Sequence, residues 1–151
     1  MKVRLEVRRE RRQALERELE ALGIAVDEEA DLVLCEAGAY ADTLLVRDRA
    51  SGERVVLAAE DIVTIEAFGH AVEVYAAGGA VYQTQERLYQ LERLLDPEQF
   101  LRISNSVIAA RAHIRRIAPA LSMKFTLTMS DGRRVDVTRS YYYGFKAVLG
   151  I

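Results

Sequence analysis

Residues 124–138 read KFTLTMSDGRRVDVT, and this stretch decides the fold that the sequence predicts. Apolar and polar side chains alternate on both sides of Asp131-Gly132, which is the pattern of a strand with one buried face. An Asp-Gly pair between two such runs favours a tight turn, because both residues tolerate the positive φ angles that the turn requires. The sequence therefore predicts an antiparallel hairpin formed by residues 124–129 and 134–138.

More short strands are predicted on the N-terminal side of this hairpin. Runs rich in β-branched and aromatic residues alternate with turn signals such as Ser51-Gly52 and Gly78-Gly79. The predicted strands comprise residues 43–47, 54–57, 62–66, 71–75, 80–83, 100–103 and 114–117. One helix interrupts them, because leucines 88, 91, 94 and 95 fall on one helical face before Asp96-Pro97. Residues 141–149 predict a second, C-terminal helix.

Residues 1–41 predict a short strand–helix–strand extension in front of this β-rich domain, which comprises residues 42–151. Apolar and charged residues alternate at the start, and leucines then recur at helical spacing up to Gly23, where a helix stop is expected. Cys35 lies in the apolar second strand, so we expect it to be a buried, unreactive side chain. The boundary between the two parts is expected between Gly38 and Asp42.

The composition excludes several classes of protein. Half of the 151 residues are hydrophobic and 29% are charged, a balance that supports a buried core and excludes wholesale disorder. The single cysteine excludes a disulfide framework and a Cys-rich zinc site. The sequence has no secretory signal pattern, and no apolar run approaches the roughly 20 residues of a membrane helix. We therefore expect a soluble, cytoplasmic protein.

No motif indicates an enzyme, a cofactor or a metal ion. The sequence has only two histidines and lacks the HExxH, GxSxG and phosphate-loop patterns. Gly78-Gly79 is not followed by the lysine and hydroxyl residue of a phosphate-binding loop. We therefore expect a non-enzymatic protein with no cofactor.

The charge is distributed unevenly along the chain. Residues 1–95 contain 12 basic and 19 acidic residues, a net charge of −7, whereas residues 96–151 contain 9 basic and 4 acidic residues, a net charge of +5. A basic region on an acidic chain is the electrostatic pattern expected for a polyanion partner. A basic face that is simply solvated explains the charge equally well.

Two polar segments follow predicted strands in this basic region. Residues 104–106 read Ser-Asn-Ser after the apolar Ile103, where their side chains are expected to point outward and bond phosphates or base edges. A turn in which these residues bond their own backbone is the alternative. Arg139 lies just past the hairpin, where a guanidinium group can bind guanine or form a surface ion pair.

The ordered set of these segments resembles the LytTR DNA-binding domain of bacterial response regulators. The resemblance is carried by residues 100–114, Asp131-Gly132, residues 137–141 and Phe145-Lys146, with residues 61–66 and the 88–95 helix upstream. It covers roughly residues 42–150. It implies a mainly β domain of stacked antiparallel sheets with one small helix. It also implies that loops, not a helix, enter successive major grooves and bend the DNA.

The resemblance also assigns roles to individual residues. It places His70, Asn105 and Arg139 at the positions that read bases. Contacts to the DNA backbone are expected from Arg102, Ser104, Ser106, Thr138, Ser140 and Lys146. Further phosphate contacts are expected among Arg111, Arg115, Arg116, Lys124 and Arg133, because these residues carry the basic charge of the C-terminal region.

The expected partners are double-stranded DNA, as direct repeats in a promoter, and a second copy of the chain. The front piece is too short for a receiver domain, so the chain resembles stand-alone LytTR regulators. Its leucine stripe, formed by Leu15, Leu19 and Leu22, is expected either to form a homodimer or to pack on the β-rich domain. Stand-alone members often sit beside a gene for a small membrane protein, which suggests a membrane-protein regulator.

A second interpretation stays open. Ser104 and Ala110 depart from the residues that many family members carry at these positions. The same fold could therefore act as a protein-interaction module through the 10–22 helix, with DNA binding lost. Binding to duplex DNA and its dependence on salt distinguish the two interpretations.

Overall fold

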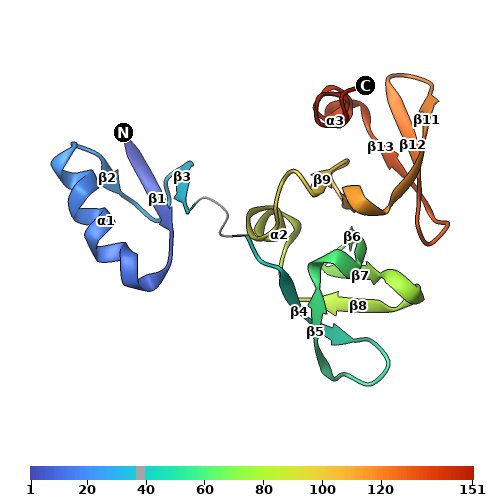
Figure 1. Cartoon of the computed structure of the whole chain (residues 1–151), viewed down its shortest axis with the longest axis horizontal. Coiled ribbons are helices and arrows are strands. Elements are labelled where there is room, and N and C mark those ends of the chain that lie inside the picture. The colour runs from blue at the N-terminus through green and yellow to red at the C-terminus, as the bar shows by residue number, and fades with distance from the viewer. Residues whose placement is uncertain (37–39) are drawn as a thin grey trace. The chain divides into compact units, whose positions relative to one another are not determined.

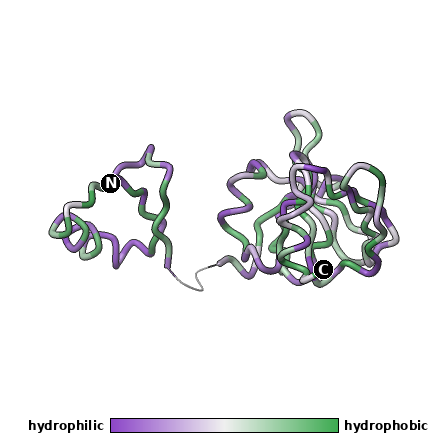
Figure 2. Tube along the Cα trace, turned by 90° about the horizontal axis from the view of Figure 1, so that it is seen from above, coloured by the Kyte–Doolittle hydropathy of each residue, from purple (hydrophilic) through white to green (hydrophobic). Residues whose placement is uncertain are grey.

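The computed structural model describes residues 1–36 and 40–151, which form two compact units. The smaller unit precedes Tyr40, and the larger unit extends from Tyr40 to Ile151 (Figure 1). The start of the predicted boundary, at Gly38, lies outside the described residues. Apolar segments are present in both units (Figure 2), and each unit buries some of its own apolar side chains.

The smaller unit is a three-stranded parallel sheet with one helix. Its elements are β1 (Lys2–Glu6), α1 (Arg9–Ala21), β2 (Ala25–Val26) and β3 (Leu32–Cys35), in the sheet order β2-β1-β3. The predicted strand–helix–strand order is confirmed, and β2 is an additional short strand. Gly23, with a φ angle of +76°, follows the end of α1, as expected for a helix stop.

Much of the apolar surface of this unit is exposed. All residues of β3 are exposed, no residue of α1 is buried, and Leu22, which follows α1, is 74% exposed. The expectation of a buried Cys35 was wrong, because β3 is an edge strand that pairs only with β1. Among the described residues of this small unit, three apolar side chains are buried, namely those of Val3, Leu5 and Ala30.

The larger unit contains a seven-stranded antiparallel sheet in the order β5-β4-β8-β7-β6-β10-β9. Its strands are β4 (Thr43–Asp48), β5 (Arg54–Ala58), β6 (Ile62–Phe68), β7 (Ala71–Ala76), β8 (Val81–Thr84), β9 (Phe100–Arg102) and β10 (Val107–Ala110). Helix α2 (Leu88–Leu94) connects β8 to the last two strands. The prediction of short antiparallel strands with one interrupting helix is confirmed.

A three-stranded antiparallel sheet and a helix complete this unit. The sheet consists of β11 (Ile114–Ala120), β12 (Lys124–Met129) and β13 (Arg134–Val137), and helix α3 (Tyr142–Leu149) follows (Figure 1). The predicted hairpin is confirmed, with Leu127 opposite Val135 and Gly132 at a φ angle of +84° in the turn. The short 3-10 helices are η1 (Ala59–Asp61), η2 (Ala77–Gly79), η3 (Arg111–His113) and η4 (Arg139–Tyr141).

The seven-stranded sheet has an apolar core on each face. One core joins the sheet to α2 through Ile65 and Leu91, and the other joins it to the C-terminal sheet and α3 through Val63, Leu127 and Phe145. The α2 prediction was wrong at Leu94, which is exposed because only one stripe of this short helix faces the sheet. No helix of the described ranges is long and apolar enough to cross a bilayer.

Candidate nucleic-acid interface

Three loops meet at one end of the larger unit. Strand pairing places Val107 opposite Glu66, and the Ala67 N–H donates to the Ser106 carbonyl at 2.8 Å, so the β9–β10 loop lies beside the β6–β7 turn. The Thr138 N–H donates to the Ile103 carbonyl at 2.9 Å, which brings the segment after β13 to the same loop. The three predicted base-reading residues therefore lie on neighbouring loops, although they are distant in the sequence.

Asn105 is exposed at the tip of the β9–β10 loop. The Tyr141 hydroxyl donates a hydrogen bond to its Oδ1 atom at 3.1 Å. One orientation of the amide is thereby favoured before any partner binds. An oriented amide can accept from and donate to an adenine edge at once. The sequence interpretation missed Tyr141, because a contact between residues 36 positions apart has no local signal.

Ser104 is buried, so the expectation that its side chain points outward was wrong. Its Oγ accepts a hydrogen bond from the Ser106 N–H at 3.2 Å, which is the backbone-bonding alternative for this segment. Ser106 itself is exposed. The loop therefore presents Asn105 and Ser106 to solvent and uses Ser104 to fix their backbone.

The Arg102 side chain binds groups within the protein, whereas a phosphate contact was predicted. Its Nε donates to the Ser104 carbonyl at 2.6 Å and its Nη2 to the Asn105 carbonyl at 2.5 Å, while Nη1 pairs with Glu92 on α2. The side chain is only 19% exposed. The guanidinium group therefore holds the backbone of the loop that carries Asn105, and it is not free for a phosphate.

Arg139 begins η4 directly after the last hairpin strand and is exposed. Within the described part of the chain, its side chain makes no hydrogen bond or ion pair. A free guanidinium group on a fixed backbone can fork onto guanine. Ser140 beside it is exposed and Thr138 is half-buried, so their hydroxyl groups flank this arginine.

His70 is exposed in the turn between β6 and β7. Gly69 adopts a φ angle of +60°, which allows the strands to reverse within two residues. The imidazole ring can donate or accept a hydrogen bond, so it can read a base edge.

Helix α3 carries the predicted backbone contact Lys146. The Nζ atom of Lys146 lies 5.4 Å from the centre of the Tyr142 ring, which stacks on Phe125 at a centroid distance of 4.8 Å. Tyr142 therefore packs against the core, whereas Tyr143 remains 68% exposed. Lys146 is half-buried, and its contact with a phosphate stays a prediction.

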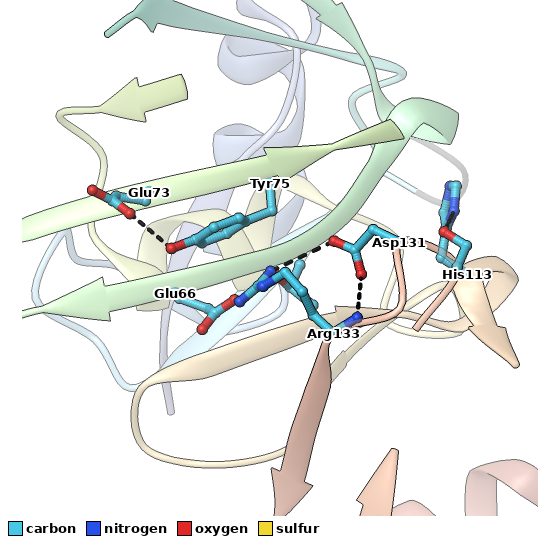
Figure 3. Close-up of polar contacts among 8 residues, drawn as sticks. Glu66, Glu73, Tyr75, His113, Asp131 and Arg133 are labelled. Carbon is cyan, nitrogen blue, oxygen red and sulfur yellow. Dashed lines mark hydrogen bonds and ion pairs between the residues drawn. The ribbon is translucent and has the colours of Figure 1, made fainter. Parts of the chain in front are cut away.

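The other basic candidates divide into two groups. Arg111, Arg115, Arg116 and Lys124 are exposed. Arg133, another of these candidates, instead reaches back to the seven-stranded sheet. Its guanidinium group pairs with Glu66, donates to Thr64 Oγ1 at 3.1 Å and lies 3.6 Å from the centre of the Tyr75 ring (Figure 3).

Other polar groups surround this arginine. Tyr75 donates its phenolic hydrogen to Glu73 Oε2 at 2.8 Å, and burial, followed by this hydrogen bond, raises the pKa of the phenol above its ordinary value of 10. His113 bonds Ser130 Oγ and the Glu60 carbonyl, each at 2.7 Å. The polar Thr64 and Glu66 within the apolar run 62–66 are a sequence signal for buried polar contacts that was not among the predictions.

The larger unit matches a known family of DNA-binding domains. The model of the LytTr DNA-binding domain family matches residues 52–150 of this chain. The structure is similar to that of a LytTr DNA-binding domain from Bacillus cereus, with a TM-score of 0.68 and 26% sequence identity. The match covers 74% of this chain and 99% of that domain.

Two curated relatives are longer proteins. The sensory transduction protein LytR of Staphylococcus haemolyticus is 25% identical over 99 residues, which is 66% of this chain and 39% of that protein. The transcriptional regulatory protein LytR of Staphylococcus aureus strain N315 is 31% identical over 70 residues, which is 46% of this chain and 28% of that protein. The chain therefore spans no more than 39% of the length of these two relatives.

Proposed function

Because this chain belongs to the LytTr DNA-binding domain family, we propose that it binds double-stranded DNA as a sequence-specific transcriptional regulator. The observation that carries the proposal is the meeting of three loops, each with an exposed side chain suited to base recognition. These side chains belong to His70, Asn105 and Arg139. Nothing in this function requires a reaction, so the protein acts by binding and not as an enzyme.

In the proposed complex, the loops enter the major groove and the base edges are read by complementary hydrogen bonds. Arg139 binds the O6 and N7 atoms of a guanine, and Asn105 pairs with the N6 and N7 atoms of an adenine. His70 reads a third base from the neighbouring turn. As the family resemblance implies, we propose that the loops contact successive major grooves and that the bound DNA is bent.

Phosphate contacts set the affinity and the register of this complex. Ser106, Thr138 and Ser140 neighbour Asn105 and Arg139 in the chain, and together with Lys146 on α3 they are the proposed contacts to the sugar-phosphate backbone. The exposed arginines after β10 add positive charge. If about five phosphates are neutralised, the logarithm of the binding constant falls with the logarithm of salt concentration with a slope of roughly −4 to −5.

We also propose that the protein acts in the cytoplasm as a homodimer on direct repeats, with the smaller unit as the dimer contact. Leu22 and the edge strand β3 are exposed, and Leu15 and Leu19 are half-buried, which leaves apolar surface for a second copy. A membrane-protein regulator remains part of the proposal. Light scattering coupled to size-exclusion chromatography tests the dimer, and a monomer at tens of micromolar contradicts it.

The experiment that tests DNA binding uses duplexes selected from a random library. Fluorescence anisotropy then compares the selected duplex with a scrambled duplex at two salt concentrations, for the wild type, Arg139→Ala and the matched control Arg134→Ala. Arg139→Ala should cost about 1–3 kcal/mol on the selected duplex and relax the base preference at one position. Arg134 is exposed on β13. The Arg134→Ala variant should therefore bind both duplexes with equally reduced affinity or with unchanged affinity.

Two results contradict the proposal. If the selection enriches no duplex and binding is weak on all of them, the chain is not a DNA reader. If Arg139→Ala keeps full affinity and full base preference, Arg139 does not read a base.

A further inference from the structure

A cluster of polar side chains joins the C-terminal hairpin to the seven-stranded sheet. This polar cluster consists of Glu66, Tyr75, Asp131 and Arg133, which are labelled in Figure 3, and of Thr64. Arg133 and Asp131 belong to the turn between β12 and β13, whereas the other three residues belong to β6 and β7. The guanidinium group pairs with Glu66, donates to Thr64 at 3.1 Å, lies 3.6 Å from the Tyr75 ring centre and is 3.7 Å from Asp131 Oδ2.

The β6 side of the cluster is buried, whereas the Arg133 side chain is 33% exposed. Thr64 is fully buried, Glu66 is 8% exposed, and the Thr64 hydroxyl donates to Glu66 Oε2 at 2.7 Å. No buried side-chain nitrogen or oxygen of the described residues lacks a hydrogen-bond partner. Separating the partners of this ion pair is costly because Glu66 is buried, and its carboxylate would lose its charged partner. The ion pair therefore selects one arrangement of the two sheets over arrangements that separate Arg133 from Glu66.

A second contact restrains the same turn. His113 bridges Ser130 and the Glu60 carbonyl, and the Ser130 N–H donates to the His113 carbonyl at 2.7 Å. The other end of β13 is attached separately, because the Thr138 N–H donates to the Ile103 carbonyl at 2.9 Å. Strand β13 is therefore attached to the seven-stranded sheet at both ends, and Arg139 follows the second attachment directly.

We propose that Arg133 and Glu66 are positioning residues, which fix β13 on the seven-stranded sheet and thereby set the distance between Arg139 and Asn105. Four strand residues, about 13 Å of chain, separate the polar cluster from the Thr138 attachment. A shift of the turn is therefore passed along a single rigid strand to the base-reading loop. This proposal rests on the proposed function, because it concerns residues that we assign to base recognition.

The neighbouring Arg134 provides a matched control. It carries the same charge and is exposed, and within the described residues its side chain makes no hydrogen bond or ion pair. A phosphate contact and a positioning residue also behave differently when they are removed. Loss of a phosphate contact weakens binding to every duplex and reduces the salt slope by about one. Loss of a positioning residue reduces the preference for the correct base and leaves the salt slope unchanged.

The first measurement is the ratio of dissociation constants for two duplexes. One is the selected duplex, and the other differs at the base pair where Arg139→Ala loses its preference. Arg133→Gln should lower this ratio at least about fivefold relative to the wild type, since a good bidentate base contact is worth about that factor or more. Arg134→Gln should leave the ratio unchanged. The double variant Glu66→Gln/Arg133→Gln should have the same ratio as Arg133→Gln alone, because the two residues act together.

The second measurement does not depend on DNA. Spin labels on Ser106→Cys and Ser140→Cys, in a Cys35→Ser background, report the spacing of the two loops. Arg133→Gln should broaden the distance distribution, whereas Arg134→Gln should keep it narrow. This measurement tests the positioning role even if the wild type binds no duplex, in which case only the proposed function fails. Arg133→Lys replaces Arg133→Gln if the latter does not fold, because lysine keeps the charge but cannot fork onto Thr64 and Glu66.

Three results overturn the proposal. An unchanged base ratio with a salt slope reduced by about one makes Arg133 a phosphate contact. An unchanged ratio with only a lower melting temperature makes the cluster purely structural. Identical distance distributions in Arg133→Gln and Arg134→Gln show that the cluster does not set the loop spacing.

Discussion

Replacing Tyr141 with phenylalanine removes one oxygen atom and, with it, the hydrogen bond to Asn105 Oδ1. The phenol and the amide are both neutral, the oxygen atoms are 3.1 Å apart, and Asn105 is exposed. Water can therefore replace the lost donor, and the contribution falls in the lower part of the range for neutral hydrogen bonds, about 0.5–1 kcal/mol. The dissociation constant should accordingly rise by about two- to fivefold on the selected duplex.

The measurement is a double-mutant cycle followed by fluorescence anisotropy. The cycle comprises the wild type, Tyr141→Phe, Asn105→Ala and the double variant, each on the selected duplex at one salt concentration. If Tyr141 acts by orienting Asn105, its replacement has no further effect once Asn105 is alanine. The free energy of unfolding in urea should change by less than about 0.5 kcal/mol, because the contact lies on the surface.

Two outcomes refute this reasoning. An equal loss of affinity in the wild-type and Asn105→Ala backgrounds means that the Tyr141 hydroxyl contacts DNA itself. Unchanged affinity in both backgrounds means that the hydrogen bond does not orient the amide in the complex. Tyr143→Phe, which removes an exposed hydroxyl from the same segment, is the matched control.

Three further outcomes follow from the structure. Arg102→Met should weaken specific DNA binding without changing the salt slope, because the guanidinium group holds the Ser104 and Asn105 carbonyls; a slope reduced by about one would make it a phosphate contact. Phe125→Ala should lower the free energy of unfolding in urea by about 3–5 kcal/mol, since the buried ring packs on Tyr142; a loss below about 1 kcal/mol would contradict this. The backbone N–H groups of Ser51 and Ala50 hold the pKa of Asp48 below its ordinary value of 3.8, so its contribution to stability is present above that value and is lost as the pH falls through the lower folded-state value. If the free energy of unfolding is measured from pH 7 to pH 2, it should therefore fall less steeply at acid pH for Asp48→Asn than for the wild type. An equal fall in both proteins would exclude a contribution of Asp48 to stability.

The fold was largely predictable from local patterns. The Asp131-Gly132 turn, the alternation on either side of it and the leucine spacing before Pro97 each depend on residues close in the sequence. Such patterns fix the type and the limits of an element, because backbone conformation and side-chain period are local properties. The same patterns could not show which strands are neighbours, and β6 lies between β7 and β10 only in the folded sheet.

Errors in the predictions of burial have one physical cause. Exposure depends on what covers a side chain, and the covering residues are distant in the sequence. Cys35 lies in an apolar strand but at an open sheet edge, and Leu94 lies on the side of a short helix that turns away from the sheet. Ser104 is polar but buried, because the loop closes over its hydroxyl.

The candidate site divides in the same way. The sequence by itself determined the β-rich class. Through the family resemblance, it also indicated positions 70, 105 and 139 as candidates for base recognition. Only the tertiary structure decided which arginines are free. No local sequence pattern distinguishes Arg102 and Arg133 from exposed arginines such as Arg134. In the folded chain, each of the two donates to backbone carbonyls or pairs with a carboxylate outside its own segment. A charged side chain that is taken out of water must be paired, and its partner is set by packing rather than by sequence distance.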